Sequence, residues 1–144
     1  MKNLYYLKLC LTVLVLVSCN QTENSLPFEK LSSDYTGINF SNTITPNLES
    51  SENLFDYDYF YNGSGVGIAD INNDGLKDII FTANQEENRI YLNKGNLKFE
   101  DITSLSKINT KNKKWSSGVT FADINNDGWL DIYISQGGPF EPKT

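Results

Sequence analysis

The sequence DINNDGLKD at residues 70–78 returns as DINNDGWLD at residues 123–131, and the fold is organised around this repeat. In both copies oxygen-bearing side chains stand at the first, third, fifth and ninth positions. A glycine follows the fifth position, and the seventh residue offers its backbone carbonyl. Carboxylate, amide and carbonyl oxygens are the ligands that Ca²⁺ takes, about six to eight at a time. The repeat therefore predicts two calcium-binding loops that join similar structural units.

The expected calcium ligands follow directly from these positions. In the first loop they are Asp70, Asn72, Asp74, the carbonyl of Leu76, and Asp78; in the second they are Asp123, Asn125, Asp127, the carbonyl of Trp129, and Asp131. Three carboxylates in each loop exceed the charge of one divalent ion, so the metal-free loop holds like charges close together. A glycine at the sixth position permits the sharp turn that brings the ninth residue back toward the ion.

The opening D-x-N-x-D-G also matches the start of an EF-hand loop, which carries a bidentate Glu at its twelfth position. Phe81 and Ile134 stand at that position here. Residues 66–69 and 119–122 precede the loops with alternating character, and short apolar runs rich in β-formers follow them, so each loop joins two strands. A metal-free Asn/Asp/Gly turn is the simpler alternative, because these residues favour turns by themselves. A turn does not, however, require an Asp at the ninth position.

Residues 65–103, with their restart at Gly118, resemble the FG-GAP or VCBS repeat, the blade unit of integrin-α-type β-propellers. Within that group the chain most resembles large bacterial surface lipoproteins whose propeller precedes an ASPIC/UnbV-like module, although no such module is visible here. The family-like stretch covers about residues 28–140. The resemblance implies an all-β fold of four-stranded antiparallel blades, with a structural Ca²⁺ bound between the first two strands of each blade.

One blade is expected over residues 65–103 and a partial blade over residues 115–144. The strands of the first blade are expected at 65–71, 78–82, 89–92 and 97–102, with a tight turn at 93–96. A propeller has about four to eight blades, and this chain holds about one and a half. We therefore expect an incomplete propeller, the N-terminal fragment of a longer protein; closure by assembly with other copies is the alternative.

The N-terminal region, residues 1–19, is interpreted as a lipoprotein signal peptide. Two lysines precede an apolar run, and residues 16–19, Leu-Val-Ser-Cys, have the form of a bacterial lipobox. An ordinary signal peptide with an incidental cysteine is the alternative. Lipidation is expected at Cys19, which predicts a membrane anchor, a polar tether over residues 20–27 and a location at the outer membrane or cell surface of the bacterial envelope.

Two segments of residues 28–144 lie before the first blade. Residues 28–32 repeat the pattern of residues 99–103, with Phe and an aliphatic residue three apart, so we expect an orphan strand at 28–32 that completes the final blade and closes the ring. Residues 41–61 form an insertion that ends in alternating aromatic and acidic residues. Its rings either pack against neighbouring blades or form a recognition surface on the propeller rim.

The composition argues against two classes of function, nucleic-acid binding and catalysis by the usual nucleophile–histidine pairs. The chain has 144 residues, a formal charge of −6, no His and two Cys. The negative charge argues against nucleic-acid binding. With no His and no mature Cys, the usual Ser-His and Cys-His pairs are impossible. The expected function is a non-catalytic, calcium-stabilised module that is anchored to the membrane by its lipid and binds a protein or glycan, as in adhesion.

Two other functions stay open. Some propellers cleave glycans, and paired carboxylates support acid–base chemistry without His. The acidic residues outside the loops that suit this role are concentrated in the insertion: Glu52, Asp56 and Asp58. A purely structural role, as a spacer that holds a C-terminal module away from the membrane, is the other alternative.

Overall fold

Six short strands and one helical turn form the regular structure of the residues that can be described. The computed structural model describes residues 28–106, 108 and 115–138. The chain divides into two units, Met1–Lys30 and Leu31–Thr144, and the elements all lie in the second. They are α2 (Ser33–Thr36), β1 (Val66–Ala69), β2 (Asp78–Phe81), β3 (Arg89–Asn93), β4 (Phe99–Asp101), β5 (Ser116–Ala122) and β6 (Asp131–Gln136). The predicted signal peptide, the lipidation site Cys19 and the tether lie outside the described residues.

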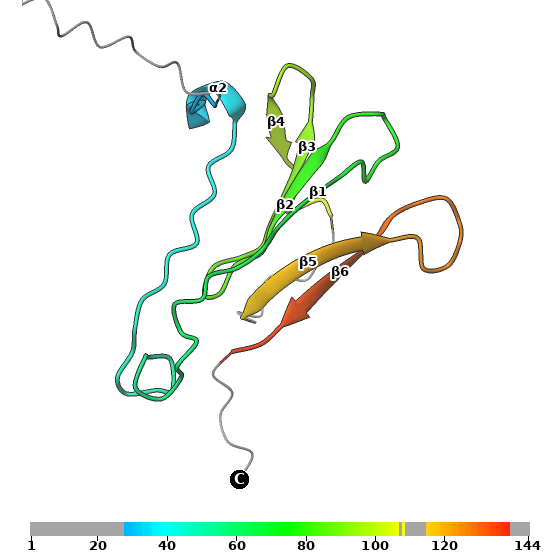
Figure 1. The fold of residues 1–144 in the computed structure, drawn as a ribbon. Helices are drawn as coiled ribbons and strands as arrows, with labels where there is room; N and C mark the ends of the chain where they lie inside the picture. Colours follow the sequence, from blue (N-terminus) through cyan, green and yellow to red (C-terminus); the bar gives the residue numbers. More distant parts are fainter. Residues whose placement is uncertain (1–27, 107, 109–114, 139–144) are drawn as a thin grey trace, which may run out of the picture. The chain divides into compact units, whose positions relative to one another are not determined.

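The strands form two antiparallel sheets (Figure 1). The first has the order β1-β2-β3-β4, with Ile68 opposite Ile79 and Ile80 opposite Ile90. The second pairs β5 with β6 and has a register shift between Ser116 and Gly118. The expected all-β fold and its four-stranded antiparallel blade are therefore confirmed. Among the described residues, no helix is long and apolar enough to cross a membrane.

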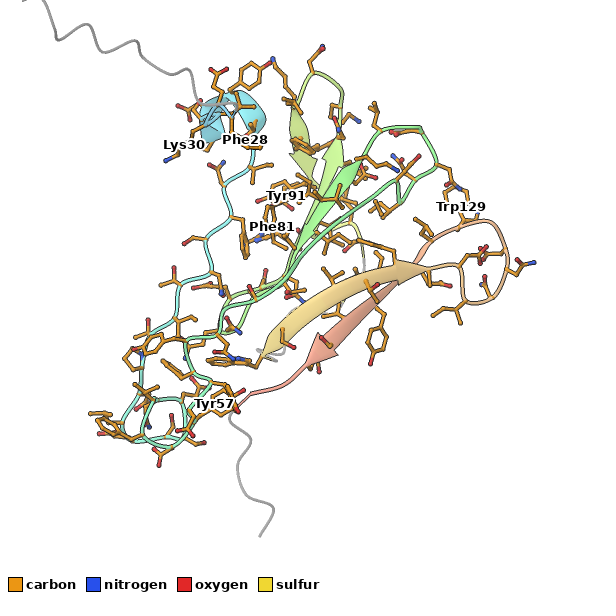
Figure 2. All side chains as sticks on the ribbon, viewed as in Figure 1. Phe28, Lys30, Tyr57, Phe81, Tyr91 and Trp129 are labelled. Atoms are coloured by element: carbon orange, nitrogen blue, oxygen red, sulfur yellow. The ribbon has the colours of Figure 1, made fainter. Side chains whose placement is uncertain are left out.

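The core of the first sheet follows from alternation. In β2 every second side chain is buried, so Asp78 and Ile80 share one face, as expected for a strand with period two. The Phe81 ring, on the other face, stacks on Phe40 at 4.7 Å between centroids and meets the edge of Tyr91 at 5.9 Å (Figure 2 labels Phe81 and Tyr91). Phe40 comes from the segment before the insertion, so this segment covers one face of the sheet.

The two sheets approach each other through β1 and β5. A Cβ at Gly67 would lie 2.7 Å from the ring of Phe121 and 2.8 Å from Val119. No side chain has room there, so Gly67 is required by the close contact between the strands. The backbone N–H of Ser116 donates to the carbonyl of Ala83 at 2.9 Å, which ties the start of β5 to the end of β2. β1 and β5, the first strands of the two sheets, therefore pack side by side.

The insertion also belongs to this core. Phe60 is completely buried and lies 5.4 Å from the ring of Trp115, and Tyr57 lies 6.0 Å from the same ring. Phe55 and Tyr59 stay exposed. Each of the two expectations therefore holds for some of the insertion rings. Tyr57 and Phe60 pack against Trp115 beside the second sheet, and Phe55 and Tyr59 face solvent.

The structure has no strand at residues 28–32, where one was expected. None of these residues is in a strand, and Ser32 is instead the N-cap of α2, with its hydroxyl accepting from the Tyr35 N–H at 3.2 Å. Residues three apart lie on opposite faces of a strand, so the shared spacing of Phe and Leu carried no strand periodicity. Ser at the cap and Asp34 in the first turn favour a helix start instead.

Most strand ends lie within one residue of the expected ones, and two boundaries differ by two residues. The first strand ends at Ala69, because the Asp70 side chain already accepts loop N–H groups. The fourth strand begins at Phe99, because Asn96 and Leu97 have φ of 53° and 56° and belong to the preceding turn. Left-handed backbone cannot continue a β-ladder, so the strand starts two residues later than the alternation indicated.

Candidate metal loops

The two repeated loops occupy equivalent places in the two sheets. Residues 70–77 connect β1 to β2, and residues 123–130 connect β5 to β6; Figure 2 labels Trp129 in the second loop. The Asn73 side-chain amide donates to the carbonyl of Gly128 at 3.1 Å. The two loops are therefore in direct contact, at corresponding ends of neighbouring hairpins (Figure 1).

The first-position carboxylate closes each loop. Asp70 accepts the backbone N–H of Asp74 at 3.1 Å on Oδ1 and that of Gly75 at 2.8 Å on Oδ2. Asp123 accepts from Asp127 and Gly128 at 3.0 and 2.8 Å with the same oxygens. A carboxylate that accepts backbone N–H groups a few residues later fixes a tight turn. Both copies thus fold by the same local hydrogen bonds.

The third and fifth positions interact with each other. Asn72 accepts the Asp74 N–H at 3.2 Å and donates through Nδ2 to Asp74 Oδ2 at 2.9 Å, while Asp74 Oδ1 accepts from the Leu76 N–H at 2.8 Å. The Leu76 N–H, and then the Asn72 amide, hold the pKa of Asp74 below its ordinary value. Asp74 is therefore ionised over a wide pH range, as an oxygen ligand must be.

The second loop repeats this arrangement. Asn125 donates to Asp127 Oδ2 at 2.8 Å, and Asp127 Oδ1 accepts from Trp129 at 2.9 Å. The backbone repeats too: Gly75 and Gly128 have φ of 86° and 87°. A Cβ at Gly75 would meet nothing within 4 Å, so left-handed backbone rather than lack of space explains this glycine.

The ninth position differs between the copies. Asp78 is 1% exposed; its Oδ2 accepts from the Ile71 N–H at 3.0 Å and its Oδ1 from the Asn93 N–H of β3 at 2.8 Å. Asp131 is half-buried, and its Oδ2 accepts from the Ile124 N–H at 3.0 Å. Asp78 thus joins the loop to the third strand, a structural role beyond the metal ligation expected from the sequence.

Sequence reasoning missed two asparagines that shape this region. Asn73 has φ of 56° and makes the contact between the loops, while Asn93 donates from Nδ2 to the Lys77 carbonyl at 2.9 Å. The signal for Asn73 was its place in the DINNDG motif, because Asn tolerates left-handed backbone better than most residues. Asn93 opens the turn expected at 93–96 and accepts from the Gly95 N–H at 2.8 Å, but no local pattern pointed to its contact with Lys77, which is 16 residues away in the chain.

The donor chemistry of the loops fits a hard cation. The side chains at the expected ligand positions offer carboxylate and amide oxygens, the ligands that Ca²⁺ prefers. Within the part of the chain that the structure describes, however, no three His, Cys, Asp or Glu side chains are placed together to hold an ion. The carboxylates are arranged around backbone N–H groups instead. The hydrogen bonds within each loop give the two loops the same shape.

Comparisons with known proteins agree with this architecture. The model of the FG-GAP-like repeat matches residues 70–134, from the start of the first loop into β6. Integrin alpha-3 of Cricetulus griseus and of Mus musculus are each 31% identical to the chain over 91 residues, which cover 56% of the chain and 8% of either relative. The chain thus spans less than a tenth of these relatives, and no solved structure matches it. Residues 70–134 therefore match an FG-GAP-like repeat, and this match together with the similarity to integrin alpha-3 supports a propeller-type architecture.

Proposed function

We propose that the chain is a non-catalytic binding module of the adhesion type, stabilised by Ca²⁺ in its two loops and attached to the bacterial cell envelope through Cys19. The observation that carries this proposal is the repetition of one loop geometry, hydrogen bond for hydrogen bond, at adjacent hairpins. The match to the FG-GAP-like repeat and the similarity to integrin alpha-3 support an adhesion-type role.

Calcium would lie between the oxygens of the first, third, fifth and ninth side chains and the carbonyl of the seventh residue. Each carboxylate oxygen that accepts one N–H still has lone-pair capacity for a cation. Each loop carries three carboxylates in nine residues, and the N–H groups neutralise their charge only in part. A bound divalent ion would offset the remaining repulsion and stabilise the folded loop.

A binding role suits the chain better than a catalytic one. The sequence has no His, and its two Cys are at positions 10 and 19, within the expected signal peptide and lipobox. Two of the acidic side chains considered for glycan cleavage have structural partners: Glu52 accepts from Gln85 at 2.7 Å and Asp56 from Asn53 at 2.6 Å. These contacts hold the insertion in place, which favours recognition over acid–base chemistry.

The calcium part of the proposal is tested by thermal unfolding of the full chain. If Kd is near the millimolar value common in extracellular sites, 10 mM CaCl₂ should add about 1.4 kcal/mol per site relative to chelator. Asp74→Ala and Asp127→Ala should each remove the calcium-dependent stabilisation of one site. The double variant should lose nearly all of the calcium-dependent stabilisation. Glu87→Gln, an exposed acidic change outside the loops, is the matched control. A double variant that responds to Ca²⁺ like the parent would overturn the ligand assignment.

The anchor is tested separately in the native host or a Gram-negative expression strain. Metabolic labelling with an alkyne fatty acid should mark the parent and not Cys19→Ser, and the variant should leave the membrane fraction. Equal labelling of both would show that Cys19 is not the lipidation site. Adhesion is then measured as retention of the intact chain on cells or matrix, compared with cells that lack it.

A further inference from the structure

A loop in the insertion, residues 52–61, has a buried side and an exposed side. Asn53 and Phe60 are buried and Tyr57 is half-buried. The side that faces inward is therefore formed by Asn53, by Tyr57 four residues later and by Phe60 three residues after that. The residues between them and the one after Phe60 face solvent: Leu54, Phe55, Asp56, Asp58, Tyr59 and Tyr61. We call residues 52–61 the aromatic loop. Its exposed side presents large apolar groups interleaved with carboxylates.

Asn53 organises the aromatic loop from inside. Its Nδ2 donates to the carbonyl of Ser50 at 2.7 Å and to Asp56 Oδ2 at 2.6 Å, and its Oδ1 accepts the N–H groups of Phe55 and Asp56 at 2.8 and 3.1 Å. A buried amide with all these partners fixes the local backbone. The loop is therefore shaped before any partner arrives, which reduces the ordering entropy of binding.

Aromatic packing fixes the other end of the loop. The rings of Tyr57 and Phe60 lie 6.0 and 5.4 Å from Trp115, the residue that precedes β5. The N–H of Phe60 donates to the Tyr57 carbonyl at 3.0 Å, and that of Asn62 donates to the Tyr59 carbonyl at 3.0 Å. Successive turns thus fix the positions of the outward residues, and the packing on Trp115 connects the loop to the second sheet.

The outward side is more apolar than a loop requires. Phe55 is 88% exposed, Tyr59 61%, Tyr61 59% and Leu54 50%. Single exposed apolar residues are common, but four within eight positions gather large apolar side chains on one loop, as binding sites do. Tyr and Phe bring large contact area with few rotatable bonds, so they bind at low entropic cost.

The negative charge around the exposed side of the aromatic loop indicates a positively charged partner. The sequence has no Lys or Arg between Lys30 and Lys77, whereas Glu49, Glu52, Asp56 and Asp58 fall within or next to the loop. The ion pairs seen in the described residues join Arg89 to Asp101 and Lys94 to Glu100, both in the first sheet. Glu52 and Asp56 accept hydrogen bonds from the neutral amides of Gln85 and Asn53, which leave their negative charge in place. Cations from outside are attracted to this charge and to aromatic faces.

We propose that the aromatic loop binds an arginine- or lysine-rich polypeptide segment of a partner protein, with Phe55 and Tyr59 contacting its cationic heads and Asp58 pairing with them. This inference rests on the proposed binding function and names its surface and its partner's chemistry. Arginine is favoured over lysine, because its planar guanidinium stacks on aromatic rings and is more weakly hydrated. The alternation of ring and carboxylate suits a segment in which basic residues recur.

The test is a fluorescence-anisotropy titration of the full chain against labelled 16-residue peptides that alternate Gly with Arg, Lys or Glu. The Arg peptide should bind most tightly, the Lys peptide more weakly, and the Glu peptide not at all. Phe55→Ala, Tyr59→Ala and Asp58→Asn should each weaken binding of the Arg peptide by about two- to fivefold. Tyr133→Ala and Glu87→Gln change equally exposed residues elsewhere and should leave Kd unchanged.

Three results would overturn the proposal. Equal weakening by the control variants would show general attraction to an acidic chain. Unchanged affinity in Phe55→Ala and Tyr59→Ala would remove the aromatic surface from the interaction. Binding to a neutral glucan oligosaccharide that these variants abolish, without binding of the Arg peptide, would identify a glycan surface instead.

The titration also separates this proposal from the one on which it rests. If the chain is retained on cells and Phe55→Ala with Tyr59→Ala is retained equally, the adhesion function stands and the aromatic loop is not its surface. If no variant or parent is retained on cells, the adhesion function fails. The peptide titration still decides the chemistry of the loop in that case, because it needs neither the anchor nor calcium.

Discussion

Asp78 and Asp131 stand at the same position of the two loops, yet their replacement by Ala should have different costs even without metal. Asp78 is 1% exposed and accepts two backbone N–H groups at 3.0 and 2.8 Å, while half-buried Asp131 accepts one at 3.0 Å. A hydrogen bond to a charged group contributes about 1.5–3 kcal/mol, and an abandoned buried donor adds its desolvation cost. Asp78→Ala should therefore lower the free energy of unfolding by about 3–5 kcal/mol, against about 1–2 kcal/mol for Asp131→Ala.

The measurement is urea unfolding of the full chain in chelator, which removes any metal contribution from both variants. Asp78→Asn serves as a milder control, because its amide keeps one acceptor oxygen and places its NH₂ against the other backbone donor. It should fall between the parent and Asp78→Ala. Equal destabilisation by the two Ala variants in chelator would refute the reasoning, since it would mean that the Asn93 contact and the burial of Asp78 add nothing to stability.

Three further predictions concern the packing of the sheets and the insertion. Phe60→Ala should cost about 3–5 kcal/mol, because it empties a completely buried site, whereas Phe55→Ala should stay within about 0.5 kcal/mol in the same urea assay; similar costs would contradict the two-sided loop. Gly67→Val should cost about 1–3 kcal/mol, because its Cβ would lie 2.7 Å from a ring on β5, and an unchanged urea midpoint would disprove the close packing of β1 and β5. Burial raises the pKa of Tyr91 above its ordinary value of 10.0, so the stability from its retained proton is complete below about pH 10 and is lost as the pH rises through the folded pKa. Tyr91→Phe should reduce the loss of stability between pH 9 and 11, and a pH profile identical to that of the parent would contradict this assignment.

Local sequence was sufficient for the strands of the first sheet and for the loops between them. Short apolar runs placed β2 and β3 within a residue of their observed ends, because both strands carry buried apolar side chains. The loop closed as its Asp, Asn and Gly positions required, since the hydrogen bonds within it reach only two to seven residues along the chain. The pattern at residues 28–32 gave no strand, because a Phe and a Leu three residues apart lie on opposite faces of a strand.

Contacts between distant segments could not be predicted in the same way. The stack of Phe40 on Phe81 and the cluster around Trp115 join residues that are far apart in the sequence. Nothing near Trp115 indicates that the insertion will cover it, because hydrophobicity has no direction. The sequence could therefore suggest two fates for the insertion rings, and only the fold distributes them between core and surface.

The ninth position of the repeat shows where the limit lies. The motif supplies the same carboxylate twice, and in both copies one oxygen accepts an N–H seven residues back in the chain. Only Asp78 also accepts from Asn93, because β3 runs beside β2 and brings that N–H to the second oxygen. The motif thus determines the loop, while the neighbouring strand determines whether the carboxylate is also part of the core. The nine-residue pattern therefore predicts the same ligand chemistry for both copies. The expected difference between Asp78→Ala and Asp131→Ala in the free energy of unfolding comes from the contact of Asp78 with the third strand.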